Sequence, residues 1–406
     1  MKKPEILSPA GDFEKLRFAV EYGADAVYMA GKTYGMRTAS GNFDSDELSK
    51  VVKYCHERGV KCFVTVNVMP RNSEIDALPE YLTYLDEIGV NAVIVADIGV
   101  IPLVKKHAPH VKLHISTQAS IVNYSSACMF HDMGADRIVL ARELPLEDIA
   151  EIRARTPSSL ELETFVHGSM CISYSGRCLL SNVMAGRDAN HGNCAQPCRW
   201  NYAVVEEKRP GQYYPVFEDE RGTYVFNSKD MCLIDHIPEL VNAGIDSFKI
   251  EGRVKTAYYA AVITNAYRRA VDKYAAEGSR YILPDAIKNE IYKVSHRDYY
   301  TGFYFHDDKN GEYRDDAAYI RDWDVCAYVL GREENGLCRV VQKNKFSKGE
   351  RLELLSPGKD PVDFIAEDMY DMDMTPLDSA PHPKMELYLR VPEDAAEMSV
   401  IRKKSV

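Results

Sequence analysis

Five cysteines in the middle of the chain are the residues whose type and spacing point most directly to chemistry. Four of them lie between Cys171 and Cys198, at positions 171, 178, 194 and 198, and the fifth is Cys232. Thiolates are soft ligands for zinc and for iron–sulfur clusters. The chain begins without the apolar core of a secretory signal, so its thiols are expected to stay reduced, which favours a metal site over disulfides.

The cysteine spacing leaves the metal open. Structural zinc sites usually contain two closely spaced C-x₂₋₄-C pairs, and here only Cys194 and Cys198 lie that close. The long gaps between the other thiols are compatible with a 4Fe-4S cluster, whose ligand spacing varies widely. Free structural thiols are the third alternative. Cysteines elsewhere fit the cores of expected helices and strands.

Short apolar, β-branched runs alternate with amphipathic segments through most of the chain, and several of these segments end in a glycine that suits a helix C-cap. A doubly wound sheet is the alternative to a barrel, but SPAGDFEKL lacks its G-x-G-x-x-G turn. Eight strands followed by helices predict an α/β fold, a parallel (β/α)₈ TIM-like barrel. The expected strands are Glu5–Ser8, Ala26–Ala30, Lys61–Val68, Ala92–Ala96, Val111–Ser116, Arg137–Ala141, Leu160–Val166 and Ser247–Ile250.

The predicted barrel occupies residues 1–280, with the cysteine-rich segment at 167–232 as an insertion. A helical and aromatic connector is expected at 281–318. Alternating strand and turn signals then predict a small C-terminal antiparallel β-barrel at 319–406. The tail SVIRKKSV is expected to be frayed.

In a barrel of this kind, the residues that do chemistry lie where the strands end at their carboxyl side, because those loops share one mouth. There are two alternative explanations of polar residues at these positions. They can simply form the rim that faces water, and Lys249 and Glu251 can form a structural ion pair. The positions that meet this condition and carry polar groups include Tyr28, Asn67, Gln118, Arg142, Glu143, His167, Glu251 and Arg253.

The overall charge argues against a protein that coats nucleic acid, since the formal net charge is −11. The cysteine segment is nevertheless locally basic, with Arg177, Arg187 and Arg199 against Asp188. Apolar stretches are too short or too interrupted to span a membrane. A cytoplasmic protein without membrane partners is therefore expected.

The run ETFVHGSMCISYSGRCLLS, from Glu163 to Ser181, resembles the signature E-x-F-x₂-G-[SA]-[LIVM]-C-x₄-G-x-C-x-[LIVM]-S. That signature is typical of the collagenase-like peptidase family of unknown catalytic type. Similar segments are ILSPAG, HISTQ, CAQPCRW, NSKDMC, SFKIEGR, RDYYTGFYF and QKNKFSKGE, so the resemblance extends over nearly the whole chain.

The resemblance implies a cofactor and an activity. Cys171, Cys178, Cys194 and Cys232 are implied as ligands of a 4Fe-4S cluster, with Cys198 as the alternative ligand and zinc as the alternative metal. The chain is most similar to the branch that forms 5-hydroxyuridine at the tRNA wobble position without oxygen, with prephenate as co-substrate. Hydroxylation factors for rRNA or quinones are other branches.

On the hydroxylation hypothesis, Gln118, Arg142, Lys249 and Arg253 bind substrate, because guanidinium and ammonium groups suit a dicarboxylate such as prephenate. The proton-transfer candidates are Glu143, His167 and Glu251. Arg177 and Arg199 would guide tRNA to the mouth, and a basic group from Lys343 to Arg351 would hold the tRNA body. A related family member is one candidate partner protein.

A collagenase-like peptidase is the second hypothesis, and a noncatalytic binding barrel is the third. The metalloprotease motif H-E-x-x-H and the G-x-S-x-G elbow are both absent from the sequence. A cysteine nucleophile would need a histidine partner such as His167 or His191.

Overall fold

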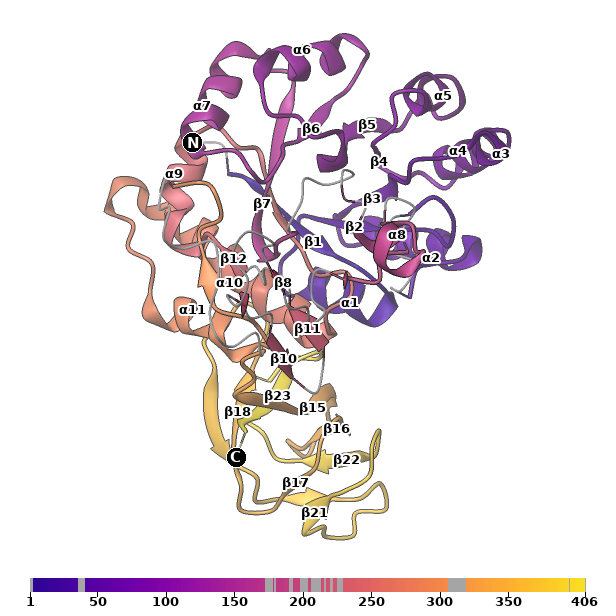
Figure 1. Ribbon diagram of the computed structural model, residues 1–406. Coiled ribbons are helices and arrows are strands. Elements are labelled where there is room, and N and C mark those ends of the chain that lie inside the picture. The colour runs from indigo at the N-terminus through magenta and orange to yellow at the C-terminus, as the bar shows by residue number, and fades with distance from the viewer. Residues whose placement is uncertain are drawn as a thin grey trace.

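The computed structural model describes residues 3–35, 41–171, 178, 180–189, 193–197, 204–205, 213–214, 217–219, 222–224, 229–305, 319–393 and 395–405. A closed barrel of parallel strands forms the larger part of the protein. A separate antiparallel sheet forms the C-terminal part, drawn in yellow in Figure 1. The predicted TIM-like barrel and the antiparallel C-terminal β domain are therefore confirmed.

The barrel strands follow chain order around the barrel, which closes because β13 pairs in parallel with both β1 and β7. The strands are β1 (Glu5–Pro9), β2 (Ala26–Met29), β3 (Lys61–Val66), β4 (Ala92–Val95), β5 (Lys112–Ile115), β6 (Arg137–Val139), β7 (Glu161–Ser169) and β13 (Ser247–Ile250).

Helices connect the strands and surround the barrel. Side chains of Asp12, Asp44, Asn123 and Thr256 cap four of them by accepting a backbone N–H. The helices are α1 (Phe13–Glu21), α2 (Ser45–His56), α3 (Asn72–Ile75), α4 (Leu78–Glu87), α5 (Val100–His107), α6 (Tyr124–Asp132), α7 (Leu146–Arg155), α8 (Leu180–Ala185), α9 (Ile237–Asn242), α10 (Ala257–Glu277) and α11 (Asp285–Glu290).

Glycines make the tight turns from helix to strand that the sequence predicts. Gly23, Gly59, Gly89, Gly134 and Gly244 each follow a helix and have φ between 70° and 98°. Other residues rarely adopt this left-handed conformation, so glycine lets each helix stop and the chain enter the next strand at once.

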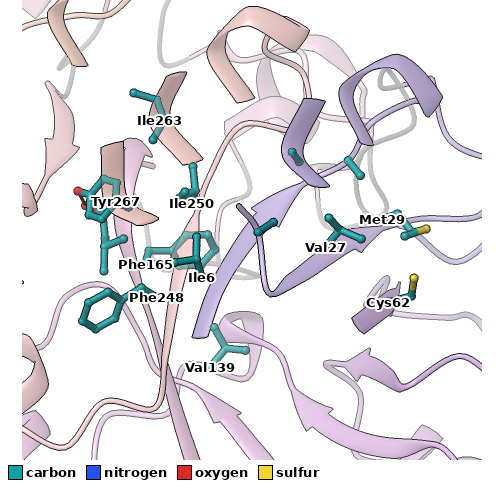
Figure 2. Packing of buried hydrophobic residues seen from close by; sticks show 14 of the residues in the cluster. Ile6, Val27, Met29, Cys62, Val139, Phe165, Phe248, Ile250, Ile263 and Tyr267 are labelled. Carbon is teal, nitrogen blue, oxygen red and sulfur yellow. Dashed lines mark hydrogen bonds between the residues drawn. The ribbon is translucent and has the colours of Figure 1, made fainter. Parts of the chain in front are cut away.

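The main core lies between the outer faces of the barrel strands and the helices. Figure 2 shows Ile263 and Tyr267 of α10 beside Ile250 and Phe248 of β13. All four side chains are fully buried. Burial of each such side chain contributes about 1.5–3 kcal/mol, so α10 is held mainly by this apolar contact.

Strand β7 is longer than its neighbours and continues beyond the barrel. Its end pairs antiparallel with β12 (Asp230–Cys232), which places Cys232 opposite His167. Strand β14 (Tyr299–Tyr300) then pairs with β12. The register of β7 against β13 shifts, because Phe165 lies opposite Lys249 whereas His167 lies opposite Ile250. Because of this bulge, the side chains of Phe165 and His167 lie on different faces of the sheet, although the two residues are two positions apart.

The C-terminal sheet has seven strands in the order β19-β18-β23-β15-β16-β22-β20. The prediction that the tail is frayed is wrong, because β23 (Val400–Lys404) lies between β18 and β15 and pairs with both. The other strands are β15 (Trp323–Arg332), β16 (Cys338–Gln342), β18 (Arg351–Leu355), β19 (Val362–Ile365), β20 (Met369–Tyr370) and β22 (Glu386–Leu389).

The remaining strands are only two or three residues long. In the cysteine-rich segment they form two separate antiparallel pairs, and β17 pairs with β21 in the C-terminal part. Their bounds are β8 (Val204–Val205), β9 (Tyr213–Tyr214), β10 (Phe217–Asp219), β11 (Gly222–Tyr224), β17 (Phe346–Ser347) and β21 (Ser379–Ala380).

The C-terminal sheet packs on α1, α10 and α11. The hydroxyl of Tyr22, the residue that follows α1, lies within hydrogen-bond distance of the carbonyls of Leu355 and Met398, at 2.9 and 3.1 Å. The Phe18 and Tyr328 rings lie 4.5 Å apart between their centres. The main core therefore extends to Tyr328, Leu355, Met398 and Val400 of the C-terminal part, while the rest of the sheet has a second core of its own. None of the helices in the described part of the chain is both long and apolar enough to cross a membrane.

Candidate active site

A buried ion pair between Lys249 of β13 and Glu163 of β7 lies inside the barrel. The Lys249 ammonium donates to Glu163 Oε1 at 2.8 Å, and both side chains are almost completely buried. The ammonium also lies 4.6 Å from the centre of the Tyr28 ring and 5.3 Å from that of Phe165. Buried charges persist when they are paired, and aromatic faces attract cations. The partner of Lys249 is thus Glu163, not Glu251.

Arg137 of β6 shares Glu163 with Lys249. Its guanidinium donates to Glu163 Oε2 at 2.8 Å and to Glu5 Oε1 at 2.7 Å. Burial, followed by the charges of Arg137 and Lys249, holds the pKa of His114 well below its usual value. His114 is therefore neutral at physiological pH, and the cations inside the barrel are balanced by carboxylates.

Arg142 follows β6, and its guanidinium lies 5.1 Å from the centre of the Phe165 ring. It also donates to the Ser169 carbonyl at 3.0 Å. Phe165 therefore contacts two cations, Arg142 and Lys249. Glu143, the next residue after Arg142, is partly buried. The signature glutamate and phenylalanine thus have a structural role, since they position the cations of the mouth.

Arg253 follows β13 and reaches across β1 and β2. It donates to Thr65 Oγ1 of β3 at 3.1 Å and to Asn42 Oδ1 at 2.9 Å. Its side chain is buried. A Cβ at Gly11 would lie 2.2 Å from the Arg253 carbonyl oxygen, so only glycine fits there. Thr65 and Asn42, both neutral, therefore help to hold the guanidinium in place.

Glu251 directly follows β13. The Tyr28 hydroxyl donates to the Ile250 carbonyl at 3.0 Å and lies 3.5 Å from Glu251 Oε2. Tyr259 of α10 donates to the Glu251 carbonyl at 2.9 Å. The carboxylate is partly exposed. Glu251 is therefore placed where a base could exchange a proton with a ligand in the mouth.

Gln118 lies just beyond β5 and is 3% exposed. Its Oε1 accepts from Asn67 Nδ2 and from Ser116 Oγ. Its Nε2 has no hydrogen-bond partner in the part of the chain that the structure describes. Gln118, Arg142, Lys249, Glu251 and Arg253 thus all lie on the carboxyl ends of barrel strands or directly after them.

His167 does not face the mouth of the barrel, where the sequence predicts it as a proton-transfer group. The bulge in β7 puts it opposite the outward-facing Ile250, and its ring packs against Tyr267 of α10, with 5.6 Å between ring centres. Its Nδ1 lies 3.5 Å from the Tyr267 hydroxyl. Burial lowers the pKa of His167 to about 3. The ring is therefore neutral and faces the helices, away from Lys249.

The described cysteines of the predicted cluster do not form a binding site as they stand. Cys171 and Cys194 are exposed, and Cys178 is partly buried. The Cys232 sulfur lies 3.9 Å from the Tyr267 hydroxyl, and burial raises the pKa of this thiol to about 12. No group of three or more His, Cys, Asp or Glu side chains among the described residues could hold a metal ion.

Four predicted residues lie outside the described residues, namely Arg177, His191, Cys198 and Arg199. In the C-terminal sheet, Lys343 pairs with Glu14 at 2.7 Å, so it connects the sheet to α1. Arg351 pairs with Asp363 on the neighbouring strand.

Sequence reasoning missed Arg137, Glu163 and Thr65 as parts of this region. Only Glu163 carried a signal, because it opens the signature motif and lies two residues before Phe165 on the same face of an expected strand. Nothing in the local sequence indicates that Arg253 reaches Thr65, since the two are 188 residues apart.

Comparison with known proteins gives matches over both parts of the chain. The model described as Peptidase family U32 matches residues 11–314, and that of the Peptidase family U32 C-terminal domain matches residues 321–402. The tRNA hydroxylation protein P1 of Bacillus subtilis (strain 168) is 35% identical and covers 99% of this chain and 95% of that protein.

Two proteins of Escherichia coli (strain K12) are also similar. The tRNA hydroxylation protein P is 36% identical over 97% of this chain and 95% of its own length. The 23S rRNA 5-hydroxycytidine C2501 synthase is 37% identical over 67% of this chain but only 40% of its own length. The similarity to the tRNA hydroxylation protein P therefore includes the C-terminal sheet.

Proposed function

Because the chain belongs to peptidase family U32, we propose that it acts in the hydroxylation of tRNA, and specifically in forming 5-hydroxyuridine at the wobble position. The observation that carries this proposal is the similarity, over nearly the full length of both chains, to the tRNA hydroxylation proteins of two bacteria.

Replacing a C5–H bond of uracil by C5–OH is a two-electron oxidation that needs an oxygen donor and an electron acceptor. The described side chains supply neither, so a co-substrate is required. Lys249 is already paired with Glu163, whereas Arg142 and Arg253 hydrogen-bond to a carbonyl, a hydroxyl and an amide, so these two guanidinium groups are the cations best suited to a carboxylate. We therefore propose that a small dicarboxylate, prephenate, is the co-substrate that supplies the hydroxyl oxygen, and that a separate redox partner accepts the two electrons.

The iron–sulfur cluster stays a prediction. A cluster would supply electron transfer, with thiolates as its ligands. In the structure Cys232 is a neutral thiol packed against Tyr267, and it would have to lose its proton to bind iron. Anaerobic purification with iron and acid-labile sulfide analysis tests the prediction. Loss of both elements in Cys171→Ala and Cys232→Ala, but not in Cys62→Ala, is expected.

Nucleoside mass spectrometry of tRNA from a strain that lacks the gene tests the proposed function. The level of 5-hydroxyuridine should fall in the deletion strain and return with the wild-type gene. We expect Lys249→Met to restore less than a tenth of it, because this variant removes a buried cation of the mouth. The control is Lys112→Met, which changes an exposed lysine at the opposite end of the barrel.

Two further measurements, of rRNA nucleosides and of gelatin cleavage, test the other activities considered for the family. Loss of 5-hydroxycytidine from rRNA, with 5-hydroxyuridine unchanged, would replace tRNA by rRNA as the substrate. Cleavage of gelatin by the purified protein, with both nucleosides unchanged, would favour the peptidase hypothesis.

A further inference from the structure

The side-chain amide of Gln118 is a buried hydrogen-bond donor without a partner. Gln118 is 3% exposed, and its Nε2 is unpaired among the described residues. A buried donor left unsatisfied destabilises a protein. Such a group needs an explanation, and a ligand that accepts the hydrogen bond is one.

Two neighbours fix the orientation of this amide. Asn67 Nδ2 donates to Gln118 Oε1 at 2.5 Å, and Ser116 Oγ donates to the same oxygen at 3.3 Å. The backbone N–H of Gln118 in turn donates to Ser116 Oγ at 3.3 Å. Because Asn67 and Ser116 both donate to Oε1 of Gln118, the NH₂ group of Gln118 is the part of the amide that can bind a ligand. The site therefore offers a donor and no acceptor.

A positive charge lies near this donor, because the hydrogen-bond partners of the two groups are close together in the chain. Arg253 bonds to Thr65 of β3, and Gln118 bonds to Asn67, two residues further along and one residue beyond the end of β3. Residues at i and i+2 of a strand share one face and are about 6.5–7 Å apart. One small ligand can therefore reach both groups.

We propose that Gln118 and Arg253 together bind a carboxylate of a small-molecule co-substrate, and that Asn67 is a positioning residue that keeps Gln118 in its donor orientation. The inference rests on the proposed function and assigns the binding of its co-substrate. One carboxylate oxygen accepts from Gln118 Nε2, and the Arg253 guanidinium compensates the charge. Asn67 acts only through Gln118.

Calorimetric titration of the full-length protein with prephenate tests this proposal in four variants. Gln118→Glu still accepts from Asn67 and Ser116 but has no donor. Asn67→Asp can only accept, so it would turn the amide and present Oε1 to the ligand. Gln118→Met removes the donor without adding charge. Asn91→Asp is the matched control, because its side-chain oxygen accepts from Cys62 N and interacts with His56 at the opposite end of the barrel.

We expect at least about tenfold weaker binding in the three mouth variants and a change below about twofold in Asn91→Asp. Thermal unfolding of each variant checks that it is folded. Wild-type affinity in Gln118→Met would show that an ordered water or nothing occupies the donor, and would overturn the proposal. Unchanged binding in Asn67→Asp would overturn the role of Asn67.

The proposal and the proposed function can fail separately. If the wild-type gene restores 5-hydroxyuridine but the protein does not bind prephenate, the carboxylate site is wrong and the function stands. If binding depends on Gln118 but the deletion strain keeps its 5-hydroxyuridine, the function is wrong and the carboxylate site stands.

Discussion

Replacement of Arg402 by methionine is expected to destabilise the protein strongly. Arg402 is 0% exposed and lies on β23 in the C-terminal sheet. Its guanidinium donates to both carboxylate oxygens of Glu290 at 2.8 and 2.7 Å, to Glu353 Oε1 at 2.7 Å and to the Tyr258 hydroxyl at 3.0 Å. One side chain therefore joins the sheet to α10 and α11.

The size of the expected loss of stability follows from the charges that would remain without Arg402. Lys293 also pairs with Glu290 at 2.9 Å and with Glu353 at 2.8 Å, so two cations face two carboxylates in the wild-type protein. Without Arg402, one lysine faces both carboxylates. Removing one partner of a buried ion pair typically destabilises by about 3–5 kcal/mol. That is a large part of a total stability of about 5–15 kcal/mol.

Urea unfolding followed by circular dichroism measures this loss as a lower midpoint. The matched control is Arg351→Met on the adjacent strand β18, where the arginine side chain is 73% exposed and its partner Asp363 is 53% exposed. We expect no measurable shift in that midpoint, because exposed pairs contribute little. Adding Glu290→Gln to Arg402→Met should recover part of the loss. Equal midpoints for Arg402→Met and Arg351→Met would refute the reasoning.

Two further predictions concern groups whose pKa is shifted by burial. The pKa of His167 is about 3 in the folded protein and about 6.5 when unfolded, so its contribution to stability is complete above pH 6.5 and is lost as the pH falls toward 3. The stability difference between wild type and His167→Gln should therefore shrink by about 1.4 kcal/mol per pH unit in this window, and a constant difference in pH-dependent urea unfolding would contradict it. For Cys232, whose pKa is raised to about 12, iodoacetamide labelling at pH 8 should be at least about 100-fold slower than for the exposed Cys194. Mass spectrometry of labelled peptides measures both rates, and similar rates would show that the pKa of the Cys232 thiol is not raised.

The barrel could be predicted because its signals are local. Each strand is a short apolar run, and glycines such as Gly59 and Gly134 mark the turns where helices end. The positions at the carboxyl ends of the strands follow from the barrel itself, so the sequence predicts where Gln118, Arg142 and Arg253 lie, while their role in binding stays a prediction.

Features that depend on distant residues could not be predicted. The tail appears polar, but Arg402 becomes a core residue because Glu290 and Glu353 arrive from other elements. The orientation of His167 depends on a bulge, which no residue in the motif reveals. Likewise, the alternation of side chains places Lys249 inside the barrel but does not identify Glu163 as its partner.

The position of β23 has a consequence for the order in which the C-terminal sheet can form. Because β23 pairs with both β18 and β15, the middle of the sheet is supplied by the strand that follows all its other strands along the chain. During synthesis, β15 and β18 therefore keep one unpaired edge each until β23 has been made. A truncation that removes β23 would leave both edges unpaired and prone to aggregation.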